Sequence, residues 1–316
     1  MTQQTFSLFD FHADDFGISI NSCNDILKLA QEKKINSLSI LPNMNTFSYA
    51  VELLKKDNST LLSSIKITVH LNFMEGHCCS DKEQVSSLVD KNGYFKISWG
   101  KLFIYNYIPF LRAKIKKQLC TEIISQTQKC IDAGIIKDKL RFDGHQHTHM
   151  IPLVFEALLM AVKHFEQKGF KTEYIRNTQD PIRPYYKAKE IKNTFNKINI
   201  IKCLILNYYS IKVRSNLKKM NLPVNYLCGV FFSGNMDFDR LSKILPYYIE
   251  KPLTQKRIIE ILFHPGEVLK DEITEEFVKP DFNIFHLSDG RKIEFSSLQK
   301  FSETNYINQL LQERRS

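Results

Sequence analysis

Glycine and proline are scarce in this chain, with 11 Gly and 10 Pro among 316 residues. That scarcity excludes collagen-like and low-complexity proteins, which contain far more of both residues. Hydrophobic residues make up 43% of the sequence and charged residues 25%, proportions that exclude a mainly disordered protein. We therefore expect a folded chain with a sizeable core.

Motifs that identify several common enzyme classes are also absent. No GxGxxG follows the first predicted strand and no GxxxxGK[ST] occurs anywhere, so the glycine-rich loops that cradle phosphates are missing. No GxSxG marks the nucleophile of a serine hydrolase. Nucleotide-binding and serine-hydrolase functions therefore lose their main support.

Long apolar runs are missing too. The most apolar stretch, residues 198–209, contains Lys202 and Asn207 and is about a dozen residues long, whereas a membrane span needs roughly 20. We predict no membrane span but a buried or interfacial helix, which could also mediate homo-oligomer formation. The N-terminus shows no signal-peptide pattern, and the seven cysteines lie mostly in apolar segments, as reduced thiols would. Both observations predict a cytoplasmic protein.

Basic residues outnumber acidic ones by 44 to 34, which gives a net charge of +10. Much of this excess is lysine spread over helical stretches such as residues 114–117 and 187–197. No interleaved basic and aromatic platform is evident, so we predict solvated helix faces rather than nucleic-acid binding. A non-catalytic protein that binds nucleic acid or another anionic surface stays an alternative, which steep salt dependence would support.

Short strand-like runs alternate with longer helical patterns, as expected for βα units with parallel strands. The predicted strands are residues 6–13, 37–41, 65–71, 139–143, 174–175, 225–232 and 258–263, and the clearest helices are 22–33, 46–56, 111–133, 152–167 and 239–248. We predict the α/β class and one irregular, (β/α) barrel-like domain over residues 1–316. Its active site should lie at the carboxyl ends of the strands. We expect a long loop or lid at residues 72–107 and a mainly helical, less barrel-like segment at about 185–225.

Several polar side chains follow the predicted strands: Asp14, Asp15, His70, His145 and His264. The carboxyl ends of parallel strands converge on one rim, so these distant residues should become neighbours. Adjacent aspartates would point to opposite faces of a regular strand, but a turn at residues 16–17 can bring both to the rim. Two adjacent carboxylates at this rim indicate either a bound cation or a different role for each of the two. Capping of the next helix is the alternative function of these residues.

Histidine recurs at every second position in His145, His147 and His149, which would place the three rings on one face of an extended segment. Two histidines and one carboxylate around an open coordination position form a well-known catalytic metal site. Not all three rings need be ligands, since some histidines orient others. A polar loop satisfied by hydrogen bonds is the alternative.

Three further side chains lie where a substrate would bind. His264 ends an apolar strand, and its place on the common rim favours a catalytic role over a structural one. Arg176 could clamp a substrate, steady a carboxylate or be a plain exposed cation. Glu75 could line the cleft or lie solvated in its loop. The remaining histidines do not share this kind of position at the rim and are predicted to be structural: His12, His77, His164 and His286.

Four motifs occur in a fixed order: HADDFG (residues 12–17), VHLNFMEG (69–76), DGHQHTHMIP (143–152) and FHPGE (263–267). Together they resemble the motifs of the YdjC-like carbohydrate deacetylases, the family that includes chitooligosaccharide deacetylase. The resemblance implies a metal-dependent hydrolase on a barrel-like fold that removes the acetyl group from an N-acetylated sugar. It covers residues 12–267, whereas residues 185–225 and the segment after residue 268 match only loosely.

The resemblance also implies roles for individual residues. Asp15, His70 and His145 would hold one divalent metal ion, Zn²⁺ or Mg²⁺, with Mn²⁺ and Co²⁺ as alternatives. Asp14 would be the general base and His264 the general acid. We further expect Arg176 and Glu75 to contact the substrate, and His147 and His149 to support the metal ligands.

Two positions depart from the family pattern. Gly144 replaces a common Ser or Thr, which should alter packing but not the ligand, and residues 228–234 lack an Asp often found in relatives. Arg291 and Glu294 resemble a C-terminal family pattern. Within enzymes, metal-dependent phosphoester cleavage is the alternative, although it would favour more ligands and basic phosphate clamps.

Overall fold

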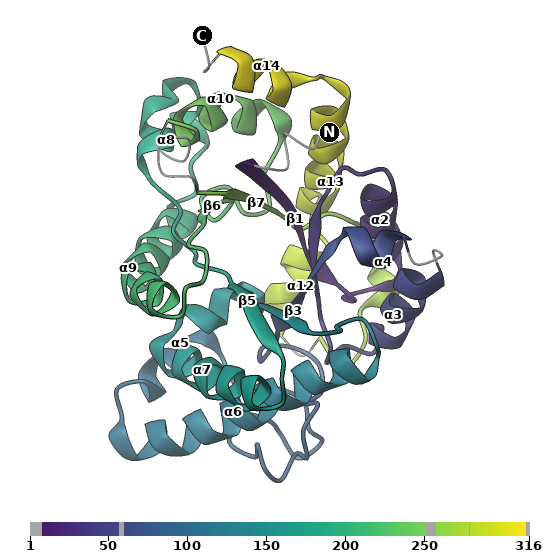
Figure 1. Cartoon of the computed structure of the whole chain (residues 1–316), viewed down its shortest axis with the longest axis vertical. Coiled ribbons are helices and arrows are strands. Elements are labelled where there is room, and N and C mark those ends of the chain that lie inside the picture. The colour runs from purple at the N-terminus through teal and green to yellow at the C-terminus, as the bar shows by residue number, and fades with distance from the viewer. Residues whose placement is uncertain (1–7, 57–59, 251–256, 278, 314–316) are drawn as a thin grey trace.

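Seven parallel strands form one sheet in the computed structural model, which describes residues 8–56, 60–250, 257–277 and 279–313. The strands are β1 (Phe9–Phe16), β2 (Ser37–Ile40), β3 (Lys66–Leu71), β4 (Lys139–Gly144), β5 (Lys171–Ile175), β6 (Tyr226–Cys228) and β7 (Ile259–Phe263). Their order in the sheet is β5-β4-β3-β2-β1-β7-β6, and every neighbouring pair is parallel. Figure 1 shows the strands as an arc surrounded by helices. The predicted α/β, barrel-like fold is confirmed.

Contacts between strands that are not neighbours show how strongly the sheet curls. The Tyr174 hydroxyl of β5 donates a hydrogen bond to Glu260 of β7, although four strands separate the two in the sheet. Leu227 of β6 also donates its backbone N–H to the Gln179 carbonyl, 2.9 Å away, just beyond β5. The two edges of the sheet therefore approach each other and nearly close a barrel.

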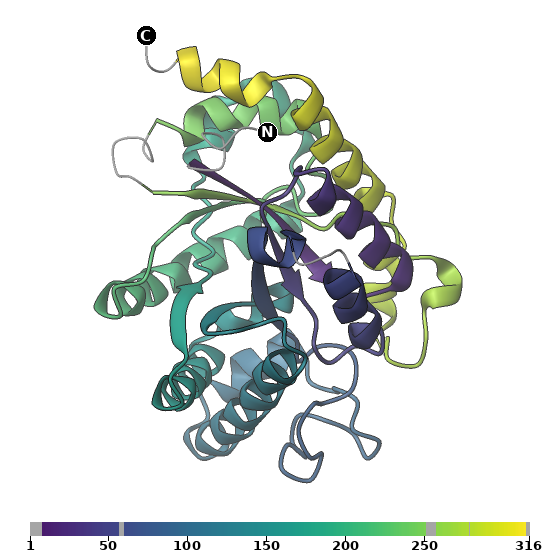
Figure 2. The same ribbon diagram turned by 45° about the vertical axis from the view of Figure 1, so that its right-hand side comes forward.

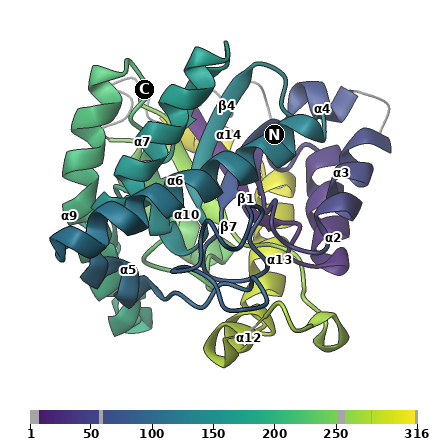
Figure 3. The same cartoon turned by 90° about the horizontal axis from the view of Figure 1, so that it is seen from below.

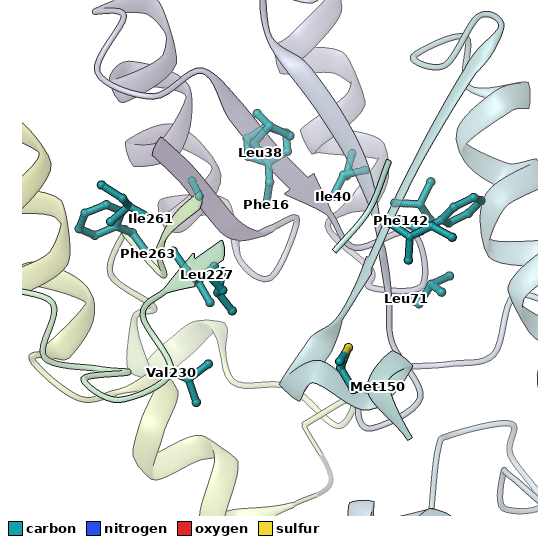
Figure 4. Close-up of a cluster of buried hydrophobic side chains, with 14 of the residues drawn as sticks. Phe16, Leu38, Ile40, Leu71, Phe142, Met150, Leu227, Val230, Ile261 and Phe263 are labelled. Atoms are coloured by element: carbon teal, nitrogen blue, oxygen red, sulfur yellow. The ribbon is translucent and has the colours of Figure 1, made fainter. Parts of the chain in front are cut away.

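The strands alternate polar and apolar residues, and both sets are buried. The side chains that contact one another across the inside of the curl are polar: Asp10, His12, Asp14, Ser37, Ser39, Thr68, His70, Arg141, Asp143, Tyr174 and Glu260. Their apolar neighbours along each strand pack against helices, and Figure 4 shows a cluster of them, including Leu38, Ile40 and Ile261. Because successive side chains of a strand point to opposite faces, the inner face can be charged while the outer face packs against helices. The charged inner face thus provides groups able to take part in catalysis.

Helices cover the outside of the arc (Figures 1 and 2). They are α2 (Ile20–Gln31), α3 (Phe47–Lys56), α4 (Thr60–Ser64), α5 (Trp99–Tyr105), α6 (Pro109–Asp132), α7 (Pro152–Gln167), α8 (Arg183–Lys187), α9 (Lys197–Lys219), α10 (Phe238–Tyr248), α12 (Pro280–His286), α13 (Gly290–Glu303) and α14 (Tyr306–Glu313). Three 3₁₀ segments, η1 (His145–Met150), η2 (Lys189–Thr194) and η3 (Lys270–Glu272), complete the structure. The side chain of Ser19 caps α2, and Pro152 stands at the start of α7, where proline is favoured.

The long loop predicted at residues 72–107 is only partly a loop, because α5 occupies its end. Ser98 provides the missed signal: its hydroxyl accepts a hydrogen bond from the backbone N–H of Lys101 and caps this helix. Residues 72–98 are irregular but anchored. Glu122 of α6 accepts hydrogen bonds from the backbone N–H groups of Cys79 and Ser80, at 2.9 and 3.0 Å.

The strand predicted at residues 225–232 ends early, at Cys228. Asp180 is the physical reason, because its buried carboxylate accepts the backbone N–H groups of residues 229–231 that a longer strand would use. Burial raises the pKa of this carboxyl to about 6, although hydrogen bonds from Tyr248 and Tyr185 oppose the shift. The segment after β6 is thus held by an Asp from another part of the chain.

Candidate active site

A β-bulge near the end of β1 turns both adjacent aspartates inward. Ala13 pairs with Leu38 and Phe16 with Ile40, so three steps along β1 oppose two along β2. Asp15 adopts a φ of 66°, a left-handed conformation that is unusual for a residue other than glycine. Asp14 and Asp15 are both buried among the inner polar side chains. The bulge, rather than the predicted turn at residues 16–17, therefore brings the pair to one side.

Asp15, His70 and His145 meet although they come from β1, β3 and the start of η1. Asp15 Oδ1 lies 3.4 Å from His70 Nε2 and 3.0 Å from His145 Nδ1. One ligand atom from each residue falls within 4.8 Å of the others, and all three residues are buried. This arrangement of two imidazole nitrogens and one carboxylate oxygen is able to hold a divalent ion.

A carboxylate behind His70 fixes which ring nitrogen faces the cluster. Nδ1 of His70 donates a hydrogen bond to Asp143 at 2.6 Å, which directs Nε2 toward Asp15. Burial would lower the pKa of His70, but Asp143 and Asp14 raise it to about 10. Asp143 lies in the DGHQHTHMIP motif, but no local pattern signals its contact with His70.

Arg176 binds Asp14 with both ends of its guanidinium. Its two terminal nitrogens donate to the two Asp14 oxygens at 2.8 Å each, while Nε donates to Glu260 at 2.6 Å. Burial would raise the pKa of Asp14, but Arg176 and His70 hold it well below its usual range. Arg176 is 0% exposed. Its contacts correspond to the alternative in which it steadies a carboxylate, and the substrate contact expected of it stays a prediction.

Glu75 is buried between two histidines instead of lying solvated in its loop. Its Oε2 lies 3.2 Å from Nε2 of His145 and 3.0 Å from Nε2 of His286. Burial would raise the pKa of Glu75, but hydrogen bonds from both rings lower it to about 2. Glu75, His145 and His286 form a second compact group of metal-binding residue types. His286, predicted to be merely structural, reaches this group from α12, a contact that no local pattern signals.

The HxHxH segment is a kinked 3₁₀ turn and not the extended segment that the spacing predicts. Gln146 and His147 have φ values of 53° and 57°, which break the period of two. His145 alone joins the Asp15 cluster, whereas Nε2 of His149 donates to the carbonyl of Arg176 at 3.1 Å. Burial lowers the pKa of both His147 and His149, so these rings favour the neutral form. The support that they were expected to give the ligands stays a prediction.

Replacing Gly144 by Ser should cost about 1–3 kcal/mol of folding free energy, the usual range for overpacking. An added Cβ would lie 2.9 Å from Nδ1 of the buried His149 ring and 3.2 Å from its backbone nitrogen. Urea unfolding measures the loss. Gly100→Ala is the control, because the nearest atom to its added Cβ is 4.0 Å away. Unchanged stability in Gly144→Ser would contradict this packing.

His264 directly follows β7, beside the aspartates. The register pairs Phe263 with Ala13, so His264 and Asp14 follow paired residues on adjacent strands. Glu294 of α13 accepts the backbone N–H of His264 at 2.5 Å, and its carboxylate lies 3.5 Å from Nδ1 of the ring. The His264 side chain stays 14% exposed, more than any of the clustered ligands. It is therefore accessible to a substrate that approaches the cluster.

Arg291 of α13 supports the other aspartate. Its Nη1 donates to Oδ2 of Asp15 at 2.9 Å, and its Nε donates to the carbonyl of Gly266 at 2.6 Å. Asp15 thus keeps Oδ1 directed toward the two histidines. The two C-terminal residues that resemble a family pattern, Arg291 and Glu294, both contact the candidate site.

Comparisons with known proteins agree with this arrangement. The model of the family described as YdjC-like protein matches residues 10–307. The chain belongs to this family. Among YdjC-like relatives, a carbohydrate deacetylase of Xenopus laevis is 22% identical over 260 residues, which cover 80% of this chain and 79% of the relative. A carbohydrate deacetylase of Clostridium beijerinckii is 26% identical over 189 residues, covering 57% and 70% of the two chains.

A solved structure shares the fold of this YdjC-like chain. It is a candidate cellobiose-phosphate cleavage protein of Enterococcus faecalis, with a TM-score of 0.64 and 17% identity over 96% of this chain and 94% of that one. The family resemblance expected from the four motifs is confirmed. In the described part of the chain, no helix has both the length and the hydropathy to cross a bilayer.

Proposed function

We propose that this protein is a metal-dependent carbohydrate deacetylase that hydrolyses the acetamide of an N-acetylated sugar to acetate and an amino sugar. The observation that carries the proposal is the meeting of Asp15, His70 and His145 within 4.8 Å, with Asp14 directly beside them. Family membership and relatives named carbohydrate deacetylase support the activity. The acetamide substrate and the metal are the specific parts of the proposal.

The residues present fit a divalent metal ion. Two imidazoles and one carboxylate suit Zn²⁺ and other first-row ions, and Mg²⁺ would need further oxygen ligands. Asp143 behind His70 and Arg291 behind Asp15 hold these donors in place, as supporting residues do around metal sites. Bound there, the ion would supply the positive charge that polarises an acetyl carbonyl and makes water acidic.

Asp14 is suited to accept the proton of the attacking water. Arg176 keeps its carboxylate ionised and fixes its orientation. Oδ1 also lies 3.2 Å from Nε2 of His12, so Oδ2 is the oxygen that retains a lone pair for a further hydrogen bond. His264 is suited to protonate the departing sugar nitrogen, because an amide anion cannot leave at neutral pH. Nδ1 of the His264 ring lies near the Glu294 carboxylate, while the ring stays partly exposed. The two residues would therefore act at opposite stages of the reaction.

Phosphoester cleavage, the alternative enzyme function, receives less support from the site. It calls for cations free to clamp a phosphate. Arg176 and Arg291 are both buried, and their guanidinium groups already bind Asp14, Glu260 and Asp15. We also propose a reducing, cytoplasmic setting, which is supported by seven unpaired cysteines.

The direct test measures acetate release from a panel of N-acetylated mono- and oligosaccharides. The protein is first stripped of metal with a chelator, and Zn²⁺, Mg²⁺, Mn²⁺ and Co²⁺ are then restored separately. We expect chelation to abolish release and at least one ion to restore it. Full activity after complete metal removal, or no acetate release from any member of the panel with any of the four ions, would refute the proposal.

Metal affinity should rise steeply with pH below about 9. Burial would lower the pKa of His145, but Asp15 and Glu75 raise it to about 9, and the pKa of His70 is about 10. Both rings are therefore protonated at neutral pH in the metal-free protein, and binding must displace those protons. If binding displaces one proton, the metal affinity rises about tenfold for each pH unit. If it displaces two protons, the affinity rises up to about a hundredfold per pH unit. Calorimetry in buffers of different ionisation enthalpy counts the protons, and release of none at pH 7 would contradict the expectation.

A further inference from the structure

Helix α9 is apolar on two faces, only one of which packs against the protein. The inner face contains Cys203, Leu206, Val213 and Leu217, all buried. The outer face exposes large hydrophobic side chains, with Ile198 74% and Tyr208 71% accessible. The exposed outer residues are Ile198, Ile201, Leu204, Ile205, Tyr208 and Ile211. Residues 198–209, predicted to form a buried or interfacial helix, therefore have one buried and one exposed apolar face.

The neighbouring α5 and the start of α6 extend this exposed surface. Ile104, Tyr107 and Phe110 are 54%, 62% and 76% exposed. Tyr107 shares a side-chain hydrogen bond with Tyr209, which joins this region to α9. Figures 1 and 3 show α5 and α9 on the same side of the molecule. We call the nine exposed side chains of α9 and residues 104–110 the apolar patch, and a contiguous patch of this kind marks a binding surface.

A cavity of about 340 Å³ lies under the exposed residues Ile198, Ile201 and Ile205 of the apolar patch. It is lined by Trp99, Gln146, Ile198, Ile201, Lys202, Ile205 and Leu206. Gln146 directly follows the candidate ligand His145, so one wall of the cavity belongs to the catalytic rim. Four of the seven lining residues are aliphatic, beside the indole of Trp99 and the polar Gln146 and Lys202. The hydroxyl groups of a second sugar would lose hydrogen bonds to water against the aliphatic part of this lining, whereas a hydrocarbon chain would not.

Basic residues predominate on the helices that carry the apolar patch, although Glu156 of α7 pairs with Arg112, Lys116 and Lys212. Helix α9 carries six basic residues and no acidic one. Helix α5 adds Lys101, and the first three turns of α6 add Arg112 and further lysines before the first acidic residue, Glu122. An apolar surface with exposed tyrosines and a basic border complements an anionic lipid bilayer. This local arrangement gives the net charge of +10 a specific place to act.

We propose that the apolar patch rests on an anionic membrane surface and that the cavity takes the hydrocarbon chain of a membrane-anchored N-acetylated sugar. The proposal rests on the proposed deacetylase function and narrows its substrate to a sugar amphiphile. With the chain in the cavity, the sugar would extend past Gln146 toward Asp14 and His264. No bilayer-spanning helix is required, because the protein would lie on the surface.

Vesicle sedimentation of the full-length protein tests the docking surface. Vesicles contain phosphatidylcholine alone or with phosphatidylglycerol, and the double variant Ile201→Glu/Ile205→Glu places two negative charges in the apolar patch. We expect the native protein to bind the anionic vesicles, and the double variant to bind them at least about tenfold more weakly. The matched control Ile20→Glu/Leu269→Glu alters two exposed hydrophobic residues of α2 and the η3 boundary and should bind within about twofold of the native protein.

Three results would overturn the docking proposal. The native protein could fail to bind anionic vesicles, or both double variants could lose binding equally. Analytical ultracentrifugation could instead show a dimer that Ile201→Glu/Ile205→Glu converts to monomers, in which case a second copy covers the apolar patch. Circular dichroism and thermal unfolding of each variant verify that it is folded.

The outcomes for docking and for catalysis can be separated. Asp14→Asn should bind vesicles like the native protein, because Asp14 lies in the interior and not in the apolar patch. Acetate release is then compared between a soluble N-acetylglucosamine oligomer and an alkyl N-acetylglucosaminide in vesicles. Preference for the vesicle substrate that disappears in Ile201→Glu/Ile205→Glu supports the proposal. Vesicle binding without acetate release from either substrate would refute the deacetylase function alone, and acetate release without vesicle binding would refute the docking alone.

Discussion

Asp14→Asn should lower kcat for acetate release by about 10²–10⁴-fold while the protein keeps its metal. The amide retains the shape of the side chain but cannot accept a proton from water. Arg176 loses one charged partner in this variant but retains Asp143 and Glu260, so the buried guanidinium is not left unpaired. Steady-state kinetics and metal analysis of the same preparation measure the two effects.

Asp10→Asn is the matched control for this experiment. Asp10 is buried on the same face of β1 but contacts Ser37, Lys66 and Arg141 instead of the candidate metal ligands. Its replacement should lower stability and leave kcat within about threefold, since no proton transfer depends on it. If both variants lost turnover equally, the loss would reflect the polar interior as a whole and the base assignment would be wrong.

His145→Ala should lose the metal and, with it, acetate release at every substrate concentration. His145 supplies one of three ligand atoms, and removing a supporting residue alone typically costs 10–100-fold in affinity, so removal of a ligand should exceed about 100-fold. Equilibrium dialysis with elemental analysis measures the bound ion. Acetate release from metal-free His145→Ala would disprove the ligand assignment.

His149→Ala separates a ligand role from mere proximity within the same segment. The His149 ring contacts the carbonyl of Arg176 and lies outside the cluster of candidate ligands. We expect this variant to bind metal within about tenfold of the native affinity. The opposite result, with metal lost in His149→Ala and retained in His145→Ala, would mean that the ring selected by the structure is not the ligand.

The predicted elements agree with the structure where local physics decides them. The helix predicted at residues 152–167 is α7 itself, since Pro152 is favoured at the first helical position and the following residues keep a helical apolar period. The strands that carry Asp14, His70 and His264 at or near their carboxyl ends also lie where the sequence predicts them, because the alternation of strand-like runs with helical patterns locates them. Parallel topology then places such ends on one rim without knowledge of any contact.

Local patterns failed where a distant segment replaces the local choice. The spacing of His145, His147 and His149 indicates an extended segment, but Gln146 and His147 adopt left-handed conformations and only one ring joins the cluster. The strand predicted to reach residue 232 stops at Cys228, because Asp180 takes the backbone donors beyond it. A period of two cannot reveal either event.

The sequence by itself determined the α/β alternation, the four motifs and the residue types from which a metal site could be built, because these depend on composition and short-range spacing. Only the tertiary structure decided that a bulge turns Asp14 and Asp15 to the same side, and that Arg176 steadies Asp14. It also decided that His286 reaches Glu75 and that the outer face of α9 stays uncovered. The physical reason is that burial and ion pairing depend on which segments the curled sheet brings together, and contacts across 200 residues leave no trace in local periodicity.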